Sequence, residues 1–347
     1  MKKHFVVFGA LIVVFVISLG SVSAQDEPQP TATMTVDEYE AAIEEYSQAI
    51  EADPEDIEAY FERVTLYFEM GRYELAIADY DRAIELDPEY VAAYLGRGLT
   101  YYYLGDYDRA IADYDRAIEL DPAFATAYSN RGEVYRILGD YESAISDYTR
   151  AIELDPGFAT DYYNRGNAYR SLGEYELAIS DFSRAIELEP LNATAYNNRG
   201  IAYYYLGDYE NAISDSNRAI KLDPKLAAAY HNRGASYFFI GNYEKAILDY
   251  NRAIEIDPKY LVSYHGRGIA YGNSGDYEHA LADFSRIIAL NSQYVLAYRE
   301  RGVVNYFLGN YEESLADFRM YEQLDGQLMP FMVEYVEEME AALEPNP

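Results

Sequence analysis

AIELDP occupies residues 151–156, and the same six residues stand at 83–88 and 117–122. The phrase recurs with small changes as AIEADP at 49–54, AIELEP at 185–190, AIKLDP at 219–224 and AIEIDP at 253–258. The proline that closes each copy follows the preceding one by 34 residues. A phrase repeated at a fixed interval of this length is typical of arrays in which each repeat forms one small structural element.

The interval divides the chain into repeats whose residues we number from one to 34. Eight full repeats begin at residues 57, 91, 125, 159, 193, 227, 261 and 295. Position 4 is Tyr in all eight, position 8 is Gly in seven and position 11 is Tyr in seven. These positions share one face of a helix, so the first part of each repeat is predicted to be an amphipathic α-helix.

A second helix is predicted to follow within each repeat. Position 15 is always Gly, which tolerates the positive φ of a helix end. Six repeats then carry a residue that caps new helices well: Asp106, Asp140, Asp208, Asn242, Asp276 and Asn310. The second helix is expected to stop at position 31, because the residue before a proline disfavours the α conformation. Each repeat is therefore predicted to be a helical hairpin.

A single hairpin cannot bury its own apolar faces, so neighbouring hairpins must stack. The pattern of an aromatic residue at position 4, Gly at 15, Tyr at 17, Ala at 20, an aromatic residue at 24 and Pro at 32 resembles the tetratricopeptide repeat. The resemblance implies an all-α, right-handed superhelical solenoid of tandem antiparallel helix pairs, with the first helices lining a concave groove. Two departures are Tyr in place of Trp at position 4 and Arg in place of Leu at position 7.

Both ends of the array fit this organisation. Thr35 and Glu38 form a predicted capping box, so residues 35–56 are expected to be a leading half-repeat helix. The eight repeats occupy residues 57–328. Residues 329–347 are predicted to be a capping helix and tail that cover the open edge of the last repeat. The array is therefore expected to contain 18 helices.

The first 24 residues have the features of a secretory signal peptide. Lys2 and Lys3 precede an apolar run, and small residues precede a predicted cleavage after Ala24. The alternative is an uncleaved membrane anchor, for which a run of 15 apolar residues is short. Residues 25–34 are predicted to be a disordered linker. The protein is thus expected to be exported, to a periplasmic, extracellular or cell-envelope location, with no membrane insertion after cleavage.

The chain is strongly acidic and contains no cysteine. Its 60 acidic and 27 basic residues give a formal net charge of −33. Such a chain repels nucleic acid, whose phosphates need clustered Lys and Arg. Disulfides and a lipid-modified cysteine are excluded because Cys is absent.

Position 7 is Arg and position 23 is Asp in every repeat. The arginines could form a ligand-binding ladder. We favour a structural interpretation, because strict repetition suits a framework and an arginine fork pairs well with a carboxylate across two helices. The spacing leaves open whether each pair forms within one repeat or between neighbours.

The resemblance places the groove at first-helix positions 2, 5, 6, 9, 12 and 13, and these vary between repeats. Residues predicted to bind a peptide or protein segment are the asparagines at position 6, the arginines at position 12 and aromatic residues at positions 12 and 13. They are Asn130, Asn164, Asn198, Asn232, Arg136, Arg170, Tyr204, Tyr205, Phe238 and Phe239. The alternative is that the rings pack between first helices and that Glu133 neutralises Arg136.

No motif indicates catalysis or a cofactor. His231 and His265 share position 5 of consecutive repeats, but two imidazoles without a third ligand rarely bind a metal. The sequence has no nucleophile elbow and no phosphate loop. The predicted function is a non-enzymatic scaffold that binds a peptide or protein segment in its groove. The competing hypothesis is a spacer or self-associating component of an envelope assembly.

Overall fold

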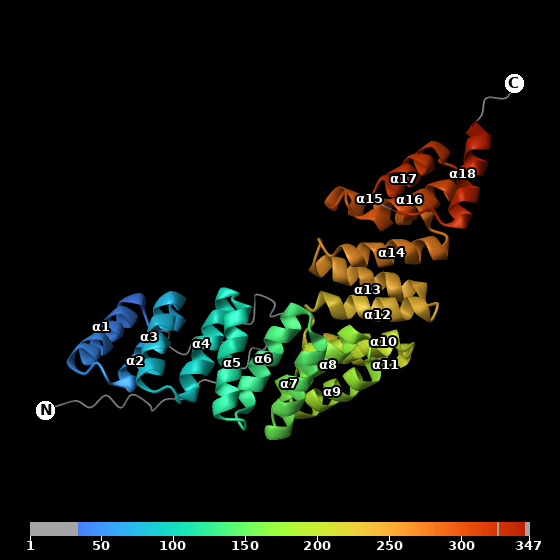
Figure 1. Ribbon diagram of the computed structural model, residues 1–347. Helices are drawn as coiled ribbons and strands as arrows, with labels where there is room; N and C mark the ends of the chain where they lie inside the picture. The colour runs from blue at the N-terminus through green and yellow to red at the C-terminus, as the bar shows by residue number, and fades with distance from the viewer. Residues whose placement is uncertain (1–33, 325, 344–347) are drawn as a thin grey trace. The chain divides into compact units, whose positions relative to one another are not determined.

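The computed structural model describes residues 34–324 and 326–343, which form eighteen α-helices joined by short turns (Figure 1). The helices are α1 (Val36–Ala52), α2 (Ile57–Glu69), α3 (Tyr73–Leu86), α4 (Val91–Leu104), α5 (Tyr107–Leu120), α6 (Ala125–Leu138), α7 (Tyr141–Leu154), α8 (Ala159–Leu172), α9 (Tyr175–Leu188), α10 (Ala193–Tyr205), α11 (Tyr209–Leu222), α12 (Ala227–Phe239), α13 (Tyr243–Ile256), α14 (Leu261–Ser274), α15 (Tyr277–Leu290), α16 (Val295–Leu308), α17 (Tyr311–Gln323) and α18 (Pro330–Leu343). Helices α2 to α17 pack as eight consecutive pairs, one for each predicted repeat. The predicted all-α solenoid of helix pairs is confirmed.

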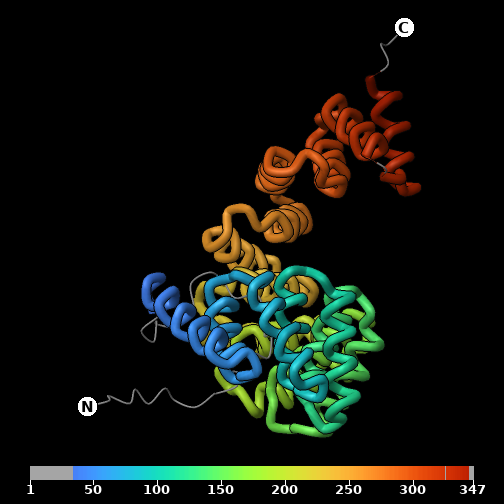
Figure 2. Tube along the Cα trace, turned by 60° about the vertical axis from the view of Figure 1, so that its left-hand side comes forward, coloured from blue at the N-terminus to red at the C-terminus, as the bar shows by residue number. Residues whose placement is uncertain are grey.

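The predicted signal peptide lies outside the described residues, as do the predicted linker except Met34 and the last four residues of the tail. The helices fall into two compact blocks, one ending at Glu189 and one beginning at Pro190. Within each block the pairs follow one another in chain order (Figure 2). No helix among the described residues has the length and apolar character needed to cross a membrane.

The turns follow the predicted chemistry. All eight position 15 glycines have positive φ, from 69° at Gly71 to 85° at Gly275. The second helices that precede a position 32 proline end at position 30. The residue at position 31 is already extended, as Asp121 shows with φ −133° and ψ 93°. The capping box is confirmed, because Glu38 N donates to Thr35 Oγ1 at 3.3 Å and Thr35 N donates to Glu38 Oε2 at 2.7 Å.

Five of the six predicted caps at position 16 accept a hydrogen bond from the helix that they precede. The prediction for Asn310 is wrong. Its Nδ2 instead donates to Asn305 Oδ1 at 3.3 Å. This repeat carries Asn in place of Tyr at position 11, so a side-chain oxygen lies within reach and attracts the amide that would otherwise face the helix start.

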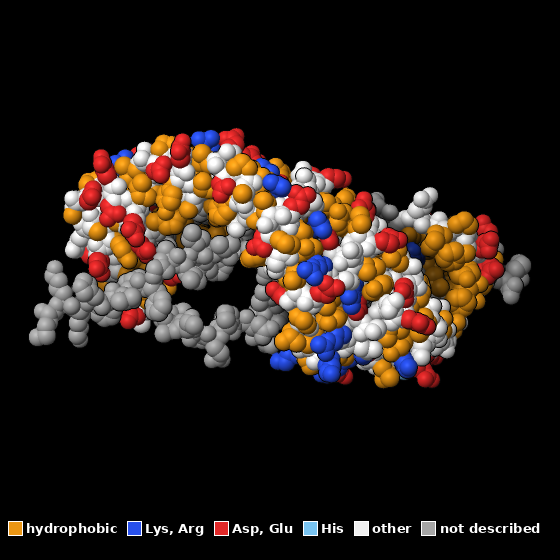
Figure 3. All heavy atoms as spheres, turned by 90° about the horizontal axis from the view of Figure 1, so that it is seen from below, with side chains coloured by type: hydrophobic (Ala, Val, Ile, Leu, Met, Phe, Trp, Pro, Cys, Tyr) orange, Lys and Arg blue, Asp and Glu red, His pale blue; other side chains and the backbone are white. Residues whose placement is uncertain are grey.

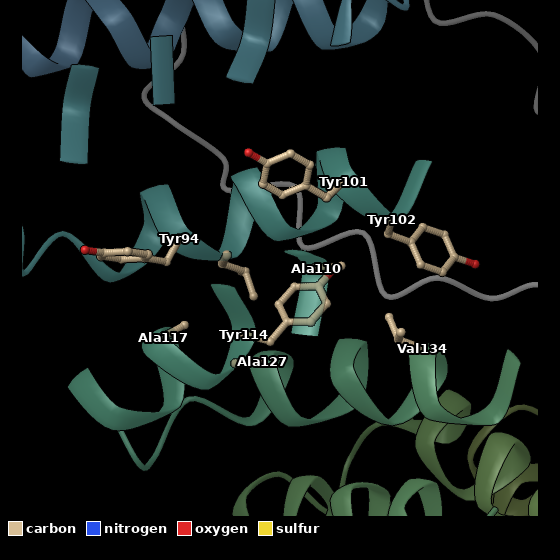
Figure 4. Packing of buried hydrophobic residues seen from close by; sticks show 9 residues of the cluster. Tyr94, Tyr101, Tyr102, Ala110, Tyr114, Ala117, Ala127 and Val134 are labelled. Carbon is tan, nitrogen blue, oxygen red and sulfur yellow. The ribbon is translucent and has the colours of Figure 1, made fainter. Parts of the chain in front are cut away.

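In six of the eight hairpins, the core is an aromatic ring at position 24 placed against the glycine at position 8. In Figure 4 the Tyr114 ring lies among side chains from α4, α5 and α6. A Cβ added at Gly98 would lie 2.8 Å from Tyr114 Cε1, closer than real carbon atoms approach. The repeat that begins at residue 193 carries Ser216 at position 24 in place of a ring, and the first repeat carries Val64 at position 8 in place of Gly. There the Tyr80 ring lies against Gly96 of the next repeat, where a Cβ would be 2.2 Å from its hydroxyl oxygen.

The arginines at position 7 pair with the aspartates at position 23 of the same repeat, in all eight repeats. Nε donates to Oδ2 over 2.7–2.9 Å and Nη2 donates to Oδ1 over 2.6–2.8 Å. The aspartate side chains are only 5–8% exposed. The structural interpretation is confirmed, and the question of which repeat supplies the carboxylate is answered.

The third guanidinium nitrogen links neighbouring repeats, which the sequence analysis missed. Within each block, Nη1 donates to the side chain at position 25 of the preceding repeat. The acceptors are Ser47, Asp81, Asp115, Thr149, Asn217, Asn251 and Ser285. Position 25 carries only Ser, Thr, Asp or Asn from residue 47 to residue 285, and that restriction was the available signal. Each of these seven arginines thus joins both helices of its own hairpin to the helix that precedes them.

Helix α18 closes the C-terminal block. Met332 and Met339 on one of its faces are fully buried against the last helix pair. The Tyr335 ring stacks on Tyr306 of α16 with centroids 3.9 Å apart and planes 11° apart. The apolar edge of the last repeat is therefore covered by a helix from outside the repeats.

Candidate functional site

The predicted binding residues all lie on first helices. Asn130, Arg136, Asn164 and Arg170 belong to α6 and α8, which contact each other in the N-terminal block. Asn198, Tyr204, Tyr205, Asn232, Phe238 and Phe239 belong to α10 and α12, which contact each other in the C-terminal block. Each block therefore holds its own candidate surface.

Arg136 is neutralised within its own helix. Its Nε and Nη2 donate to Glu133 Oε2 and Oε1 at 2.8 and 2.7 Å. The Glu133 carboxylate is buried, and it also accepts a hydrogen bond of 2.9 Å from the Tyr148 hydroxyl. This pairing raises the pKa of Arg136. By contrast, no hydrogen bond or ion pair joins the Arg170 guanidinium to another described residue, so its donors are open to a partner.

The asparagines at position 6 are buried or half-buried and do not project from the surface. Asn130, Asn164 and Asn198 are buried, and Asn232 is half-buried and donates to Asn197 Oδ1 at 2.8 Å. Asn130 is only 2% exposed, yet its Oδ1 has no hydrogen-bond partner among the described residues. A buried oxygen without a donor is unfavourable, so this position is prepared to accept a hydrogen bond.

A second acceptor lies on the neighbouring helix. Asp161 of α8 is buried and its Oδ1 also lacks a partner among the described residues. Burial raises the pKa of Asp161 to about 6, against a hydrogen bond with Ser129 that lowers it. Sequence reasoning missed Asp161, whose only signal is a carboxylate at position 3. These acceptors can receive hydrogen bonds from amide or ammonium groups.

The aromatic residues of the C-terminal block divide by position. The position 12 rings, Tyr204 and Phe238, are half-buried and each makes an edge contact with Phe239, at centroid distances of 5.4 and 5.5 Å. The position 13 rings, Tyr205 and Phe239, are 60% and 55% exposed. The alternative interpretation, packing between first helices, describes the position 12 rings and one side of Phe239, which contacts Tyr204 of the neighbouring first helix. More than half of each position 13 ring nevertheless stays exposed.

Exposed rings at position 13 also occur in other repeats, where Tyr103 is 45% and Phe307 is 50% exposed. Apolar side chains are visible among acidic and basic ones over the face of the molecule that Figure 3 presents. Scattered exposed apolar residues are ordinary in proteins. Aromatic residues are enriched at protein interfaces, and here large rings recur at one position of the first helices.

His231 and His265 are both half-buried in the C-terminal block. His231 Nδ1 lies 3.1 Å from Ser263 Oγ, and its ring contacts those of Tyr250 and Tyr260. Burial, and then the neighbouring His265, lower the pKa of His231 to about 4. Among the residues that the structure describes, no group of three or more His, Asp or Glu side chains is placed to hold a metal ion.

Models of one protein family match most of the chain. Four tetratricopeptide repeat models match it, two of them described as "Tetratricopeptide repeat" at residues 95–157 with 265–328 and at residues 191–259. A "TPR repeat" model matches residues 65–105 and 166–207, and a further tetratricopeptide repeat model matches 45–78 and 147–180. No curated protein sequence matches the chain.

Solved structures of this family resemble the chain. The crystal structure of YrrB, described as "a TPR protein with an unusual peptide-binding site", is 29% identical, with a TM-score of 0.50; the match covers 54% of this chain and 97% of YrrB. A tetratricopeptide repeat protein from Parabacteroides merdae is 23% identical with a TM-score of 0.57, and the match covers 72% of this chain and 98% of that protein. The Cut9–Hcn1 hetero-tetramer gives 19% identity and a TM-score of 0.55, over 77% of this chain and 52% of that one. Proteins of this kind are generally non-catalytic scaffolds, and their repeats bind peptides or proteins. Helix pairs, turns and these matches agree, and the chain belongs to the tetratricopeptide repeat family.

Proposed function

We propose that this chain is an exported, non-enzymatic scaffold that binds an extended peptide or protein segment along the face of its first helices. The observation that carries the proposal is the set of exposed rings at position 13: Tyr103, Tyr205, Phe239 and Phe307, each 45–60% exposed. Rings of this size offer large apolar area with few rotatable bonds, so they gain much when a partner covers them.

Polar groups on the same helices support the proposal. Asn130 and Asp161 present buried oxygens without partners among the described residues, and Arg170 makes no ion pair there. A peptide backbone supplies the amide donors that the oxygens lack, and an acidic side chain or terminal carboxylate suits Arg170. YrrB, whose description names a peptide-binding site, is the more similar of the three solved structures by sequence.

We expect that replacing Tyr205 and Phe239 together with Ala weakens binding of the partner about tenfold or more, which corresponds to about 1.4 kcal/mol. The partner is captured from the host envelope fraction with the full chain, identified, and titrated by calorimetry. Both rings are more than half exposed, but Phe239 also contacts Tyr204 and Tyr209. The variant should therefore stay folded, with a slightly lower thermal melting temperature.

The matched control is Leu177→Ala with Leu248→Ala, since these leucines are 48% and 66% exposed but lie on the second helices α9 and α13. The control should bind normally, and Arg170→Ala should weaken a partner that presents a carboxylate. Unchanged affinity in the Tyr205→Ala, Phe239→Ala variant, with the fold intact, would remove the first-helix face from the binding site.

Export has its own test. Protein recovered from outside the cytoplasm is expected to begin at Gln25, because the small residues before Ala24 suit a signal peptidase. Mass spectrometry of the intact protein measures this directly. Recovery of a chain that retains Met1 in the membrane fraction would instead support the anchor.

A further inference from the structure

Three aromatic rings repeat as a cluster where first helices meet. We call this cluster an aromatic triad: the rings at positions 12 and 17 of one repeat and at position 13 of the next. In the N-terminal block, Phe68, Tyr73 and Tyr103 form a triad with centroid distances of 5.4, 5.2 and 5.9 Å. The position 17 and 13 rings stack, and the position 12 ring meets each of them by an edge.

The C-terminal block contains the same arrangement. Tyr204 lies 5.7 Å from Tyr209 and 5.4 Å from Phe239, with interplanar angles of 64° and 78°. Tyr209 and Phe239 stack at 5.4 Å and 15°. At the last repeat no further repeat supplies a ring, and Tyr335 of α18 stacks on Tyr306 instead. Even where the repeats end, the chain therefore places another ring beside the position 12 ring.

One triad lacks its first member. Tyr277 and Phe307 stack at 5.4 Å with planes 6° apart, as the corresponding rings do elsewhere. Position 12 of this repeat is Gly272, the only Gly at that position. A Cβ added there would meet no heavy atom within 4 Å. A cavity of about 210 Å³ opens here, lined by Gly268, Gly272, Tyr277, Val304 and Phe307 among others.

We infer that this cavity binds an aromatic side chain of the partner segment, which completes the triad in the place left by Gly272. The inference rests on the proposed function and names one residue class of the partner. An apolar cavity of about 150 Å³ is large enough to bind benzene, so the present one admits a phenyl or indole ring.

The walls favour an aromatic over an aliphatic side chain. Tyr277, Phe284 and Phe307 all line the cavity, and the complete triads show that an edge-on ring fits the stacked pair. Edge-to-face contacts between rings stabilise beyond the area that they bury. An aliphatic side chain would be stabilised only by the burial of its apolar surface.

Charge restricts which residues can flank the aromatic residue of the partner. Glu300 lines the cavity and pairs with Arg299 beside it, so the cavity itself offers no free cation, while the chain as a whole carries a net charge of −33. Acidic residues next to the aromatic residue would be repelled. The occupant is therefore an aromatic residue flanked by neutral or basic residues.

The probe for the test is N-acetyl-L-tryptophanamide, because the chain contains no Trp and the probe's fluorescence reports only its own surroundings. The full chain is expected to bind one probe per molecule with a blue-shifted emission. Gly272→Tyr fills the cavity and should abolish the shift, whereas Gly272→Ala adds one methyl group and should retain it. N-acetyl-L-leucinamide should compete about tenfold less well.

The reciprocal variant is Tyr204→Gly, which removes the first ring of a complete triad and should raise the stoichiometry to two. Circular dichroism confirms that each variant is folded, and Phe307→Ala serves as a second loss-of-site variant if Gly272→Tyr does not fold. Equal binding to Gly272→Tyr, or no saturable binding to the unmodified chain, would overturn the inference. Probe binding that weakens as the protein is concentrated would assign the cavity to a second copy of this chain and would also overturn it.

This test is separate from that of the proposed function. If the probe fails to bind but Tyr205→Ala with Phe239→Ala still weakens the natural partner, the cavity proposal fails and the scaffold proposal stands. If the probe binds as expected and those substitutions leave the partner unaffected, the cavity remains while the face assigned to the partner is wrong.

Discussion

Asp181→Ala is expected to lower the free energy of unfolding by about 3 kcal/mol, because it removes one member of a buried, doubly hydrogen-bonded pair. The Asp181 side chain is 7% exposed and Arg165 is 16% exposed. Without the carboxylate, Arg165 loses the acceptors of both Nε and Nη2. Its remaining bond, from Nη1 to Thr149 of the preceding repeat at 2.9 Å, is then less well fixed.

Urea denaturation and hydrogen exchange measure the effect, which should be largest in α8 and α9 and should reach α7 through Thr149. The control is Arg165→Met with Asp181→Leu, because replacing a whole buried pair with apolar residues is often neutral. If Asp181→Ala and the double substitution destabilise equally, the loss comes from packing volume, and the unpaired charge is not its cause.

Gly302→Ala is expected to cost about 2 kcal/mol, although Ala is the better helix former by about 1 kcal/mol. The added Cβ would lie 2.6 Å from Phe318 Cε1 and 2.7 Å from Cδ1. Phe318 is buried and cannot turn away. The ring must shift together with the helix that carries it, so the overpacking outweighs the gain in helix propensity.

The chain contains a matched control for this substitution. Gly200 occupies position 8 of another repeat, but position 24 of that repeat is Ser216 and not an aromatic residue. A Cβ at Gly200 would meet no atom closer than the Ala212 carbonyl oxygen at 3.3 Å. Gly200→Ala should therefore be neutral or slightly stabilising in thermal melting. Equal destabilisation of both variants would show that the ring is not the cause.

Much of the fold could be predicted because its determinants are local and recur. A helix end with positive φ, a capping side chain and a proline stop act over a few residues, so each can be identified from spacing alone. The pairing of position 7 with position 23 was also predictable, since both positions border the contact between first and second helices, but the spacing did not show whether the two partners lie in one repeat. The failed cap at Asn310 shows the limit: a single Tyr to Asn exchange at position 11 supplied a competing acceptor from another turn of the chain.

The candidate surface depended on more than spacing. The sequence placed the asparagines, arginines and rings on the correct helices, but it did not show which of these side chains are buried and which are exposed. Glu133 holds Arg136 because Tyr148 of the second helix also holds that carboxylate. Asn130 is only 2% exposed, which its position in the repeat did not indicate. The burial of one residue depends on side chains from several helices, so it cannot be deduced from the spacing of residues within one repeat.

The sequence by itself determined the helix pairs and their turns, because each rests on contacts within one 34-residue period, and it indicated that Arg at position 7 pairs with Asp at position 23. The structure decided that both partners lie in one repeat and that Nη1 reaches the preceding repeat. Only the tertiary structure decided which rings are exposed, which polar atoms lack a partner and that Gly272 leaves a cavity. The triad around Gly272 draws its rings from one helix pair and the first helix of the next. Its missing member becomes visible only when those helices are packed together, because an empty volume is bounded by side chains that are far apart in the chain.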